Sequence, residues 1–232
     1  MSERLTPFSE VCMKGDIVIV QAHHEKVARE IVPQLITKVR QKNRIFIMTV
    51  GGESGSGKSE ISLAIANEFT KNGIKTIIFG QDDYFYLPPK SNSKKRRENP
   101  DWLGPHIEVN LDLLEKNLID AIHGKSETVK PSIDYNSDTI ETQTIALSGV
   151  KVIIAEGTYT SLLRNVDTRI FITRNWLVTI EDRKQRNRGN EVSEPFTENI
   201  LATEHKIIAG HKHLADFIVT DDYEVINVGL DL

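Results

Sequence analysis

The chain has 232 residues, of which 39% are hydrophobic and 27% are charged, so it is long enough to bury a substantial core. Its formal net charge of −4 argues against general coating of nucleic acid, which needs a basic surface. The single cysteine excludes an intramolecular disulfide, and no apolar run approaches the roughly 20 residues of a membrane span. The composition therefore predicts a soluble, cytoplasmic globular protein that binds neither nucleic acid nor membrane.

Apolar, β-branched runs alternate with stretches of helical periodicity, a pattern typical of βαβ architecture. Strands are predicted at 16–20, 45–50, 75–79, 150–155, 169–172 and 217–219, with an antiparallel pair between 129 and 147. Helices are predicted at 27–39, 58–71, 111–122, 176–188 and 196–214, the first kinked or interrupted near Pro33. The polar stretch at 80–105 is expected to be a long functional loop. Together these elements predict a three-layer α/β domain with a mostly parallel central sheet.

Residues 52–59 match the pattern G-x-x-x-x-G-K-[ST], between a predicted buried strand and an amphipathic helix. The glycines let the backbone wrap a phosphate chain, and the positive N-terminus of the helix faces the same anion. Lys58 would reach the β- and γ-phosphates, and the Ser59 hydroxyl would ligate Mg²⁺. The candidate nucleotide-binding residues of this P-loop are Gly52, Glu53, Ser54, Gly55, Ser56, Gly57, Lys58 and Ser59.

Two carboxylates follow other predicted strands. Asp82 leaves the C-terminal end of the strand at 75–79, where ligands bind in open α/β sheets. A carboxylate there can accept a proton from a substrate hydroxyl or help to hold the metal. Glu156 follows the strand at 150–155 and can hold Mg²⁺ directly or through water. A loop-capping aspartate and a solvated strand-end glutamate are the structural alternatives.

Basic residues form two further groups. Arg183, Arg186 and Arg188 lie on a predicted helix, and arginines that close over a transferring phosphoryl group stabilise its spreading negative charge. The alternative is a solvated basic helix face. The run at 94–97 is interpreted as part of a solvated loop, although it could also meet an acidic or phosphorylated substrate.

In order and spacing these elements resemble the uridine kinase/phosphoribulokinase family of P-loop small-molecule kinases. The residues that carry the resemblance are the P-loop, Gln81–Phe85, Glu156–Tyr159, the arginines at 183–188 and Ala215–Ile218. The resemblance implies a kinase that uses ATP and Mg²⁺ on a small-molecule hydroxyl acceptor. It implies that Asp82 takes the acceptor proton, that Ser59, Glu156 and Asp82 organise Mg²⁺, and that Lys58, Arg183 and Arg186 act in catalysis. Arg188 would contact the nucleotide from a lid near 183–195.

The acceptor half departs from the uridine kinase pattern, in which a Pro-x-Tyr-Asp segment is followed closely by a histidine. Ile133 stands at the tyrosine's position in this chain, and Asp138 stands where the histidine is expected. An isoleucine offers no hydroxyl to a polar base edge. The predicted acceptor is therefore a nucleoside or a related sugar or polyol. The candidate acceptor contacts are Asp83, Tyr84, Trp102, His106, Asp134 and Tyr135.

Residues 1–44 are predicted to form an N-terminal extension, a strand plus a helix, that packs on the kinase domain at 45–232. The same extension could instead form a subunit contact in a homo-oligomer. Two other activities stay open: a P-loop NTPase whose hydrolysis drives a partner, and a nucleotide-binding regulatory protein with weak catalysis. ATP turnover that depends on an acceptor would distinguish a kinase from both.

Overall fold

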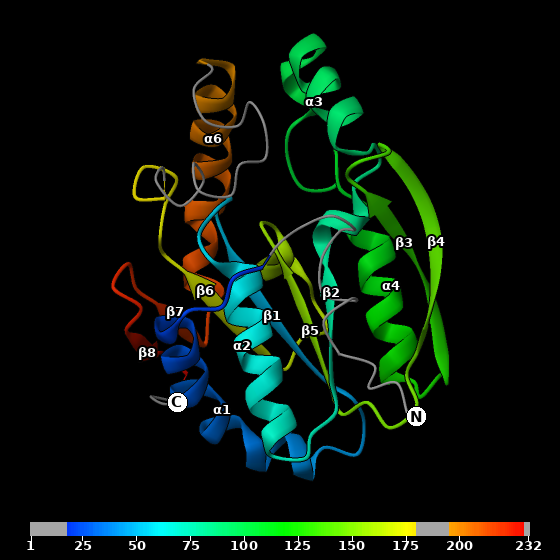
Figure 1. Cartoon of the computed structure of the whole chain (residues 1–232), viewed down its shortest axis with the longest axis vertical. Helices are drawn as coiled ribbons and strands as arrows, with labels where there is room; N and C mark the ends of the chain where they lie inside the picture. The colour runs from blue at the N-terminus through cyan, green and yellow to red at the C-terminus, as the bar shows by residue number, and fades with distance from the viewer. Residues whose placement is uncertain (1–17, 180–194, 230–232) are drawn as a thin grey trace, which may run out of the picture.

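The computed structural model of the protein describes residues 18–179 and 195–229. Over these residues a six-stranded sheet forms the centre, in the order β2-β5-β1-β6-β7-β8 (Figure 1). Its strands are β1 (Phe46–Gly52), β2 (Thr76–Gly80), β5 (Val152–Gly157), β6 (Thr168–Ile172), β7 (Phe217–Val219) and β8 (Val225–Asn227). Neighbouring strands are parallel except β7 and β8. β1 and β5 are buried along their whole length, because helices cover both faces of the sheet.

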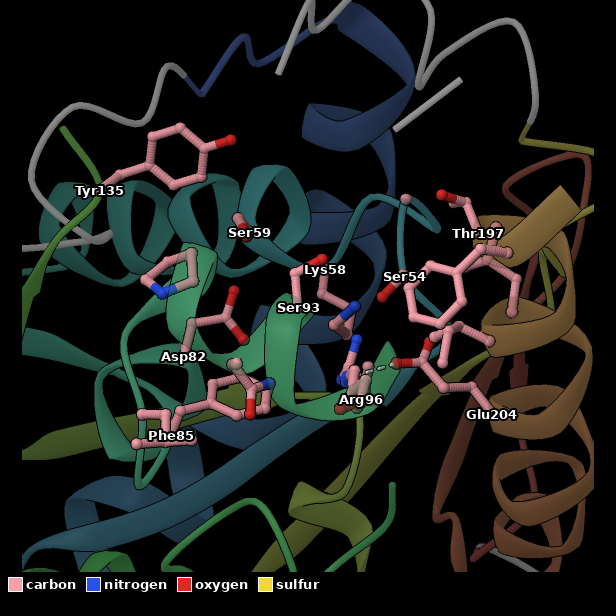
Figure 2. Close-up of a pocket in the computed structure, with 18 of the residues that line it drawn as sticks. Ser54, Lys58, Ser59, Asp82, Phe85, Ser93, Arg96, Tyr135, Thr197 and Glu204 are labelled. Atoms are coloured by element: carbon pink, nitrogen blue, oxygen red, sulfur yellow. Dashed lines mark hydrogen bonds and ion pairs between the residues drawn. The ribbon is translucent and has the colours of Figure 1, made fainter. Parts of the chain in front are cut away.

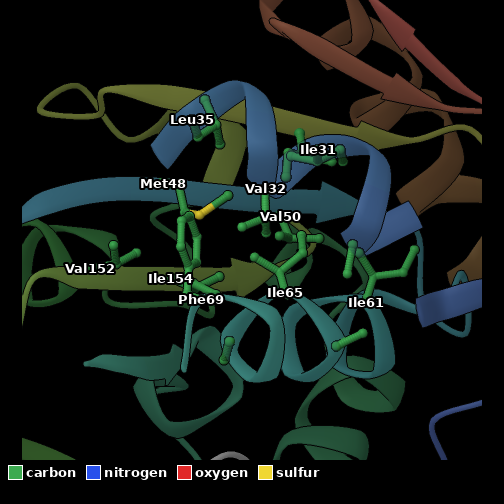
Figure 3. Close-up of a cluster of buried hydrophobic side chains, with 14 of the residues drawn as sticks. Ile31, Val32, Leu35, Met48, Val50, Ile61, Ile65, Phe69, Val152 and Ile154 are labelled. Carbon is green, nitrogen blue, oxygen red and sulfur yellow. The ribbon is translucent and has the colours of Figure 1, made fainter. Parts of the chain in front are cut away.

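Helices lie on both faces of this sheet and enclose two hydrophobic cores. The helices are α1 (Ala22–Gln41), α2 (Lys58–Lys71), α3 (Pro89–Glu98), α4 (Leu111–Ile122) and α6 (Pro195–Ile208). On one face, α1 and α2 pack on β1 and β5, with Ile31, Ile65 and Met48 among the side chains in contact (Figure 3). On the other face, α4 and the end of α6 pack through Leu114, Leu118 and Ile208. The predicted three-layer α/β fold with a mostly parallel sheet is confirmed.

An antiparallel hairpin of β3 (Glu127–Asp134) and β4 (Thr139–Ala146) stands apart from the central sheet, as predicted. Its turn is tied to the start of α3 by Asp138. The Asp138 carboxylate accepts hydrogen bonds from the backbone N–H groups of Lys90 and Ser91, at 2.7 and 3.2 Å, and from the Ser91 hydroxyl at 2.8 Å. A carboxylate at a helix N-terminus satisfies N–H groups that have no partner within the helix. Asp138 therefore caps α3.

The polar stretch at 80–105 is not the long loop that was predicted. It contains α3 and two short 3₁₀ turns, η2 (Gln81–Tyr84) and η3 (Pro100–Trp102). Pro89 is the first residue of α3 and Pro100 is the first residue of η3. Proline is compatible with the first helical position, where its missing N–H group costs nothing. These prolines therefore mark the starts of helical segments within a stretch whose polar composition predicted a loop.

The N-terminal part of the chain also differs in detail from the prediction. No strand forms over residues 18–20, where Val18 and Val20 pack against the α1–α2 core while Ile19 is exposed; residues 16 and 17 lie outside the described part. The apolar side chains of this segment are thus buried against helices, and the segment does not pair with a strand of the sheet. α1 continues through Pro33 without interruption, because its buried face offsets the hydrogen bond that proline cannot donate.

The C-terminal part contains two further differences. The predicted helix at 196–214 is α6 followed by a 3₁₀ turn, η5 (Ala209–Leu214). The predicted helix at 176–188 begins with a turn at 176–179, and residues 180–188 lie outside the described residues. β8 was not predicted, because it is only three residues long, too short for a periodic pattern to show. In the part of the chain that the structure describes, no helix is long and apolar enough to cross a bilayer.

Candidate active site

The P-loop connects the end of β1 to the first residue of α2, in the arrangement that its motif predicts. Gly57 is the N-cap of α2 and has a φ of 97°, a backbone conformation that strongly favours glycine. A Cβ atom on Gly52 would lie 2.9 Å from the backbone oxygen of Ile172, so no larger residue fits there. The first N–H groups of α2 have no partner within the helix and direct a positive field toward the loop. This cradle suits a phosphate chain.

Lys58 and Ser59 stand at the mouth of this cradle. The Lys58 ammonium donates to the backbone oxygen of Glu53 at 2.9 Å, and the Ser59 hydroxyl donates to Glu156 Oε1 at 3.4 Å. Glu156 is 6% exposed. Burial is the largest cause that raises the pKa of Glu156 to about 8, and the negative charge of Asp82 is the second. The positive charge of Lys58 lowers this pKa and so opposes both.

Ser59, Glu156 and Asp82 form an oxygen donor set suited to Mg²⁺. All three line one cavity, so a hydroxyl and two carboxylates converge beside the phosphate loop. Hard divalent cations prefer oxygen ligands, and Mg²⁺ in phosphoryl-transfer sites is completed by phosphate oxygens and water. A cation here would also stabilise the two neighbouring carboxylates in their ionised forms. The residues present therefore fit the metal that the P-loop motif implies.

The cavity has a volume of about 270 Å³ and lies between the P-loop, η2, α3 and α6 (Figure 2). Figure 2 shows Asp82 on one side of it and Glu204 at the α6 wall on the other, with Lys58 between them and Arg96 below Lys58. The lining residues are Ser54, Gly55, Lys58, Ser59, Asp82, Phe85, Leu87, Pro89, Asn92, Ser93, Arg96, Tyr135, Glu156, Thr158, Phe196, Thr197, Ile200, Leu201 and Glu204. Beyond the phosphate loop the wall mixes apolar side chains with polar and charged ones.

Arg96 is the main surprise at this wall, because the basic run at 94–97 was interpreted as a solvated loop. The run lies on α3, and its members face different directions: the Lys94 side chain is 78% exposed and the Arg96 side chain is 17% exposed. Arg96 Nε donates to Glu108 Oε2 at 2.7 Å, and Arg96 Nη2 lies 3.5 Å from Glu204 Oε1. The helical periodicity of α3 turns one residue of the run into the cavity.

Glu108 is the centre of a buried hydrogen-bond network behind Arg96. Its side chain is fully buried, and it accepts hydrogen bonds from Asn92 Nδ2 at 3.0 Å and from the Gly104 backbone N–H at 3.3 Å. The Tyr159 hydroxyl donates to it at 3.5 Å. These bonds join α3, the segment after η3 and the end of β5, so the network fixes the position of Arg96.

Of the six predicted acceptor residues, Tyr135 lines the cavity. Asp83, adjacent to Asp82, forms a buried ion pair with Lys130 and accepts from the Ile133 backbone N–H at 3.0 Å. Tyr84 is buried and donates through its hydroxyl to Asn117 at 3.0 Å. The 3₁₀ turn η2 therefore points Asp82 into the cavity and its two successors into the hairpin and α4.

The other three predicted acceptor residues also lie off the cavity wall. Trp102 donates from Nε1 to Asn92 Oδ1 at 2.7 Å and thus supports the wall from behind. The His106 side chain is 56% exposed, 3.7 Å from Asp112. Asp134 accepts from the backbone N–H groups of residues 136 and 137 and shapes the β3–β4 turn. Turn formation explains this aspartate without a ligand.

The predicted lid arginines Arg183, Arg186 and Arg188 lie outside the described residues. The structure describes the chain on both sides of that segment. Before it, Trp176 donates its backbone N–H to Glu53 Oε2 at 2.8 Å, and after it, α6 lines the cavity. The α6 contribution was missed because Phe196, Ile200 and Glu204 recur at intervals of four. That spacing is equally typical of an ordinary core-facing helix.

Comparison with known proteins agrees with this geometry. The family model described as "Phosphoribulokinase / Uridine kinase family" matches residues 47–209. A uridine kinase from Oceanobacillus iheyensis is 26% identical over 190 residues, covering 78% of this chain and 88% of that protein. The bifunctional alpha-galactosidase/sucrose kinase AgaSK from Mediterraneibacter gnavus is 27% identical over 195 residues, 79% of this chain. The match spans only 21% of that larger protein.

A solved structure supports the same fold. Phosphoribulokinase from Rhodobacter spheroides superposes with a TM-score of 0.57 at 13% sequence identity, covering 77% of this chain and 71% of that chain. At this identity the likeness concerns the fold alone. The family model, by contrast, covers more than half of the sequence, including the P-loop, Asp82, Glu156 and all of α6. The resemblance drawn from the motifs is thus confirmed: the chain belongs to the phosphoribulokinase/uridine kinase family.

Proposed function

We propose that the protein is a kinase that transfers the γ-phosphoryl group of ATP, with Mg²⁺, to a hydroxyl of an uncharged small molecule. The observation that carries the proposal is that one cavity holds both the phosphate loop, through Lys58 and Ser59, and the carboxylate of Asp82. A nucleotide seated in the loop would direct its terminal phosphate toward Asp82. The rest of the cavity leaves room for an acceptor. The membership of this chain in the phosphoribulokinase/uridine kinase family supports the same class of reaction.

Each residue has a role that follows from its position. The N–H groups of the P-loop hold the phosphates, and Lys58 neutralises charge on them. Asp82 accepts the proton of the attacking hydroxyl, which makes that oxygen a better nucleophile. Ser59, Glu156 and Asp82 would hold Mg²⁺, which supplies charge neutralisation at the phosphates. Arg183 and Arg186 would close over the transferring group and Arg188 over the nucleotide, excluding water that would otherwise hydrolyse ATP.

The part of the cavity wall formed by α3 and α6, called the acceptor wall below, carries charges that favour an uncharged acceptor. Among the described lining residues outside the phosphate loop, Arg96 is the basic one, and it is already flanked by the carboxylates of Glu108 and Glu204. Asp82 adds another negative charge on the opposite side. A phosphorylated acceptor would have to displace an existing ion pair and approach these carboxylates. A nucleoside, sugar or polyol meets neither cost, and the sequence relatives include proteins named uridine kinase and sucrose kinase.

An acceptor screen tests the proposal. Purified protein with ATP and Mg²⁺ is assayed for ADP release with uridine, cytidine, ribose, fructose, sucrose and glycerol, and with ribulose 5-phosphate as a charged comparison. We expect ADP release that depends on one of the uncharged acceptors and is abolished in Lys58→Ala. Turnover that is the same without any acceptor would indicate an NTPase instead. Nucleotide binding without turnover for any acceptor would indicate the regulatory alternative.

A further inference from the structure

Glu204 of α6 presents an unused hydrogen-bonding atom on the acceptor wall. Its side chain lines the cavity and is 5% exposed. Its Oε1 lies 3.5 Å from Arg96 Nη2, whereas its Oε2 is buried and has no hydrogen-bond partner among the residues that the structure describes. We propose that Glu204, together with Arg96, binds a second hydroxyl of the acceptor and thereby selects a sugar or the sugar portion of a larger molecule. This inference rests on the proposed function, because it assigns a role within the same cavity.

Glu204 is not needed to balance the charge of Arg96. Arg96 Nε donates to Glu108 Oε2 at 2.7 Å, and the Glu108 side chain is fully buried. The contact of Arg96 with Glu204 is longer, at 3.5 Å, and involves one oxygen of the carboxyl group. Two buried carboxyl groups thus share one guanidinium. A buried polar atom without a partner destabilises the folded protein, so its presence on a cavity wall indicates a role toward a ligand.

The groups around Glu204 leave its Oε2 available. Burial is the largest influence on the pKa of Glu204 and raises it, and Glu108 acts in the same direction. Arg96, Lys58 and Ser54 lower this pKa. Lys58 and Ser54 belong to the P-loop, so Glu204 faces the part of the cavity beside the phosphates. None of these groups donates a hydrogen bond to Oε2.

A hydroxyl group matches the pair formed by Arg96 and Glu204. A guanidinium only donates and a carboxylate only accepts, whereas a hydroxyl does both. One hydroxyl placed between the two side chains can therefore bond to each of them. A protonated Glu204 can donate as well as accept, so the match holds in either form. An ammonium group would be repelled by Arg96, and a phosphate would be repelled by an ionised Glu204.

The position of Glu204 shows which hydroxyl it would contact. Asp82 lies on one side of the cavity and Glu204 lies on the other (Figure 2). An acceptor whose attacking hydroxyl lies at Asp82 must carry a different hydroxyl to reach Glu204. The same cavity is lined by the apolar side chains Phe85, Leu87, Phe196, Ile200 and Leu201. A sugar ring combines hydroxyls at its edge with apolar C–H faces, and pockets that mix apolar walls with a few placed polar groups suit such a ligand.

The test removes one hydroxyl from the acceptor and the carboxyl group from the protein, separately and together. Wild type and Glu204→Met are assayed with ATP and Mg²⁺ on uridine, D-glucose and D-fructose, and on monodeoxy analogues of each. For the parent that is phosphorylated, we expect one monodeoxy analogue to lose about 10–100-fold in kcat/KM with wild type. Glu204→Met should lose a similar factor on the parent. It should lose little more on that analogue, because the two changes remove the same bond.

Two further variants complete this experiment. Glu204→Gln keeps a group that donates and accepts, so it should lose less activity on the parent acceptor than Glu204→Met does. Glu198→Ala, at an exposed position of α6, is the matched control and should discriminate between parent and analogue as wild type does. Urea unfolding of each variant establishes that folded protein is compared. Arg96 keeps its bond to Glu108 in all of them.

Three results would be decisive against these assignments. An equal loss of Glu204→Met on the parent and on every monodeoxy analogue would overturn the inference, because Glu204 would then only support the wall. Wild-type protein that phosphorylates 1-propanol as efficiently as the sugars would overturn it as well, since a second hydroxyl would then contribute nothing. Wild-type protein whose ATP turnover depends on no acceptor would overturn the proposed function itself.

Discussion

Glu53 of the P-loop and His205 of α6 are bound to one another, with Glu53 Oε1 2.6 Å from His205 Nδ1. The other carboxylate oxygen of Glu53 accepts the Trp176 backbone N–H at 2.8 Å. Glu53 was predicted to bind the nucleotide as part of the phosphate loop. Its buried side chain also joins that loop to the two segments that flank residues 180–194, where the lid is proposed. The loop and the cavity wall formed by α6 are therefore held together directly.

Replacing Glu53 with alanine should destabilise the protein. The change removes two hydrogen bonds from one buried carboxylate, and bonds to charged groups contribute about 1.5–3 kcal/mol. We expect a loss of about 2 kcal/mol in the free energy of unfolding, measured by urea denaturation. Glu25→Ala, in an exposed pair with Arg29, is the control and should cost at most about 0.5 kcal/mol. Equal losses in the two variants would contradict this account.

The neighbouring residues Asp82 and Asp83 should respond in opposite ways to the same change. Asp82→Asn removes the proposed general base, so kcat should fall about 10²–10⁴-fold while the protein stays folded. Asp83→Asn leaves Lys130 as an unpaired buried charge, which should cost about 3–5 kcal/mol of stability. Steady-state kinetics and urea unfolding of both variants check the contrast. Loss of activity in a fully stable Asp83→Asn protein would show that the two roles are assigned wrongly.

Arg96 should matter far more than the other basic residues of α3. Arg96→Met leaves the fully buried Glu108 without its cation, with an expected loss of about 3–5 kcal/mol in unfolding free energy. Lys94→Met, on the exposed side of α3, should change stability by no more than about 0.5 kcal/mol. The double variant Arg96→Met/Glu108→Gln should recover part of the loss, because the buried charge is removed as well. An Arg96→Met protein as stable as Lys94→Met would refute the network.

Glu204 should make stability depend on pH. Burial raises the pKa of Glu204, and this effect outweighs the opposing charge of Arg96. The folded state therefore holds this proton at pH values where the unfolded chain has lost it. Stability is full below the ordinary glutamate pKa of 4.5 and falls as pH rises through the raised value.

Urea unfolding of metal-free protein between pH 5 and pH 8 measures this dependence. The neutral variant Glu204→Gln should lose less stability over the interval than wild type does. Glu98→Gln, whose glutamate is 58% exposed, is the matched control on α3 and should follow the wild-type curve. Parallel curves for wild type and Glu204→Gln would mean that the Glu204 proton is lost at its ordinary pH.

Local signals in the sequence were sufficient where one short segment carries both the structure and the chemistry. The P-loop is such a segment: its strand, glycines, lysine and helix follow each other directly, and the helix at 58–71 was predicted with its observed bounds. Alternation predicted the β3–β4 hairpin, and the helix at 111–122 was predicted directly after Asn110, whose side chain caps α4 by accepting from the Leu113 N–H. Each of these features depends on residues within a few positions of one another.

The acceptor wall depends on contacts between segments that are distant in the chain, and local patterns were a weaker guide to it. Arg96 resembled its solvated neighbours until α3 turned it toward Glu108 and Glu204, which lie 12 and 108 residues further along the chain. Asp138, at the position expected to hold a histidine, proved to be a helix cap. A titratable side chain has the same appearance in a sequence whether it faces substrate, a partner or water.

The sequence by itself determined the layered α/β fold, the phosphate loop and the family, because apolar periodicity and a contiguous motif encode them locally. Only the tertiary structure decided which carboxylates and arginines share a cavity. It separated Asp82 from Asp83, brought Arg96 between two buried glutamates and joined Glu53 to His205. The physical reason is that burial and charge pairing are set by neighbours in space, and these neighbours come from helices and strands far apart in the chain.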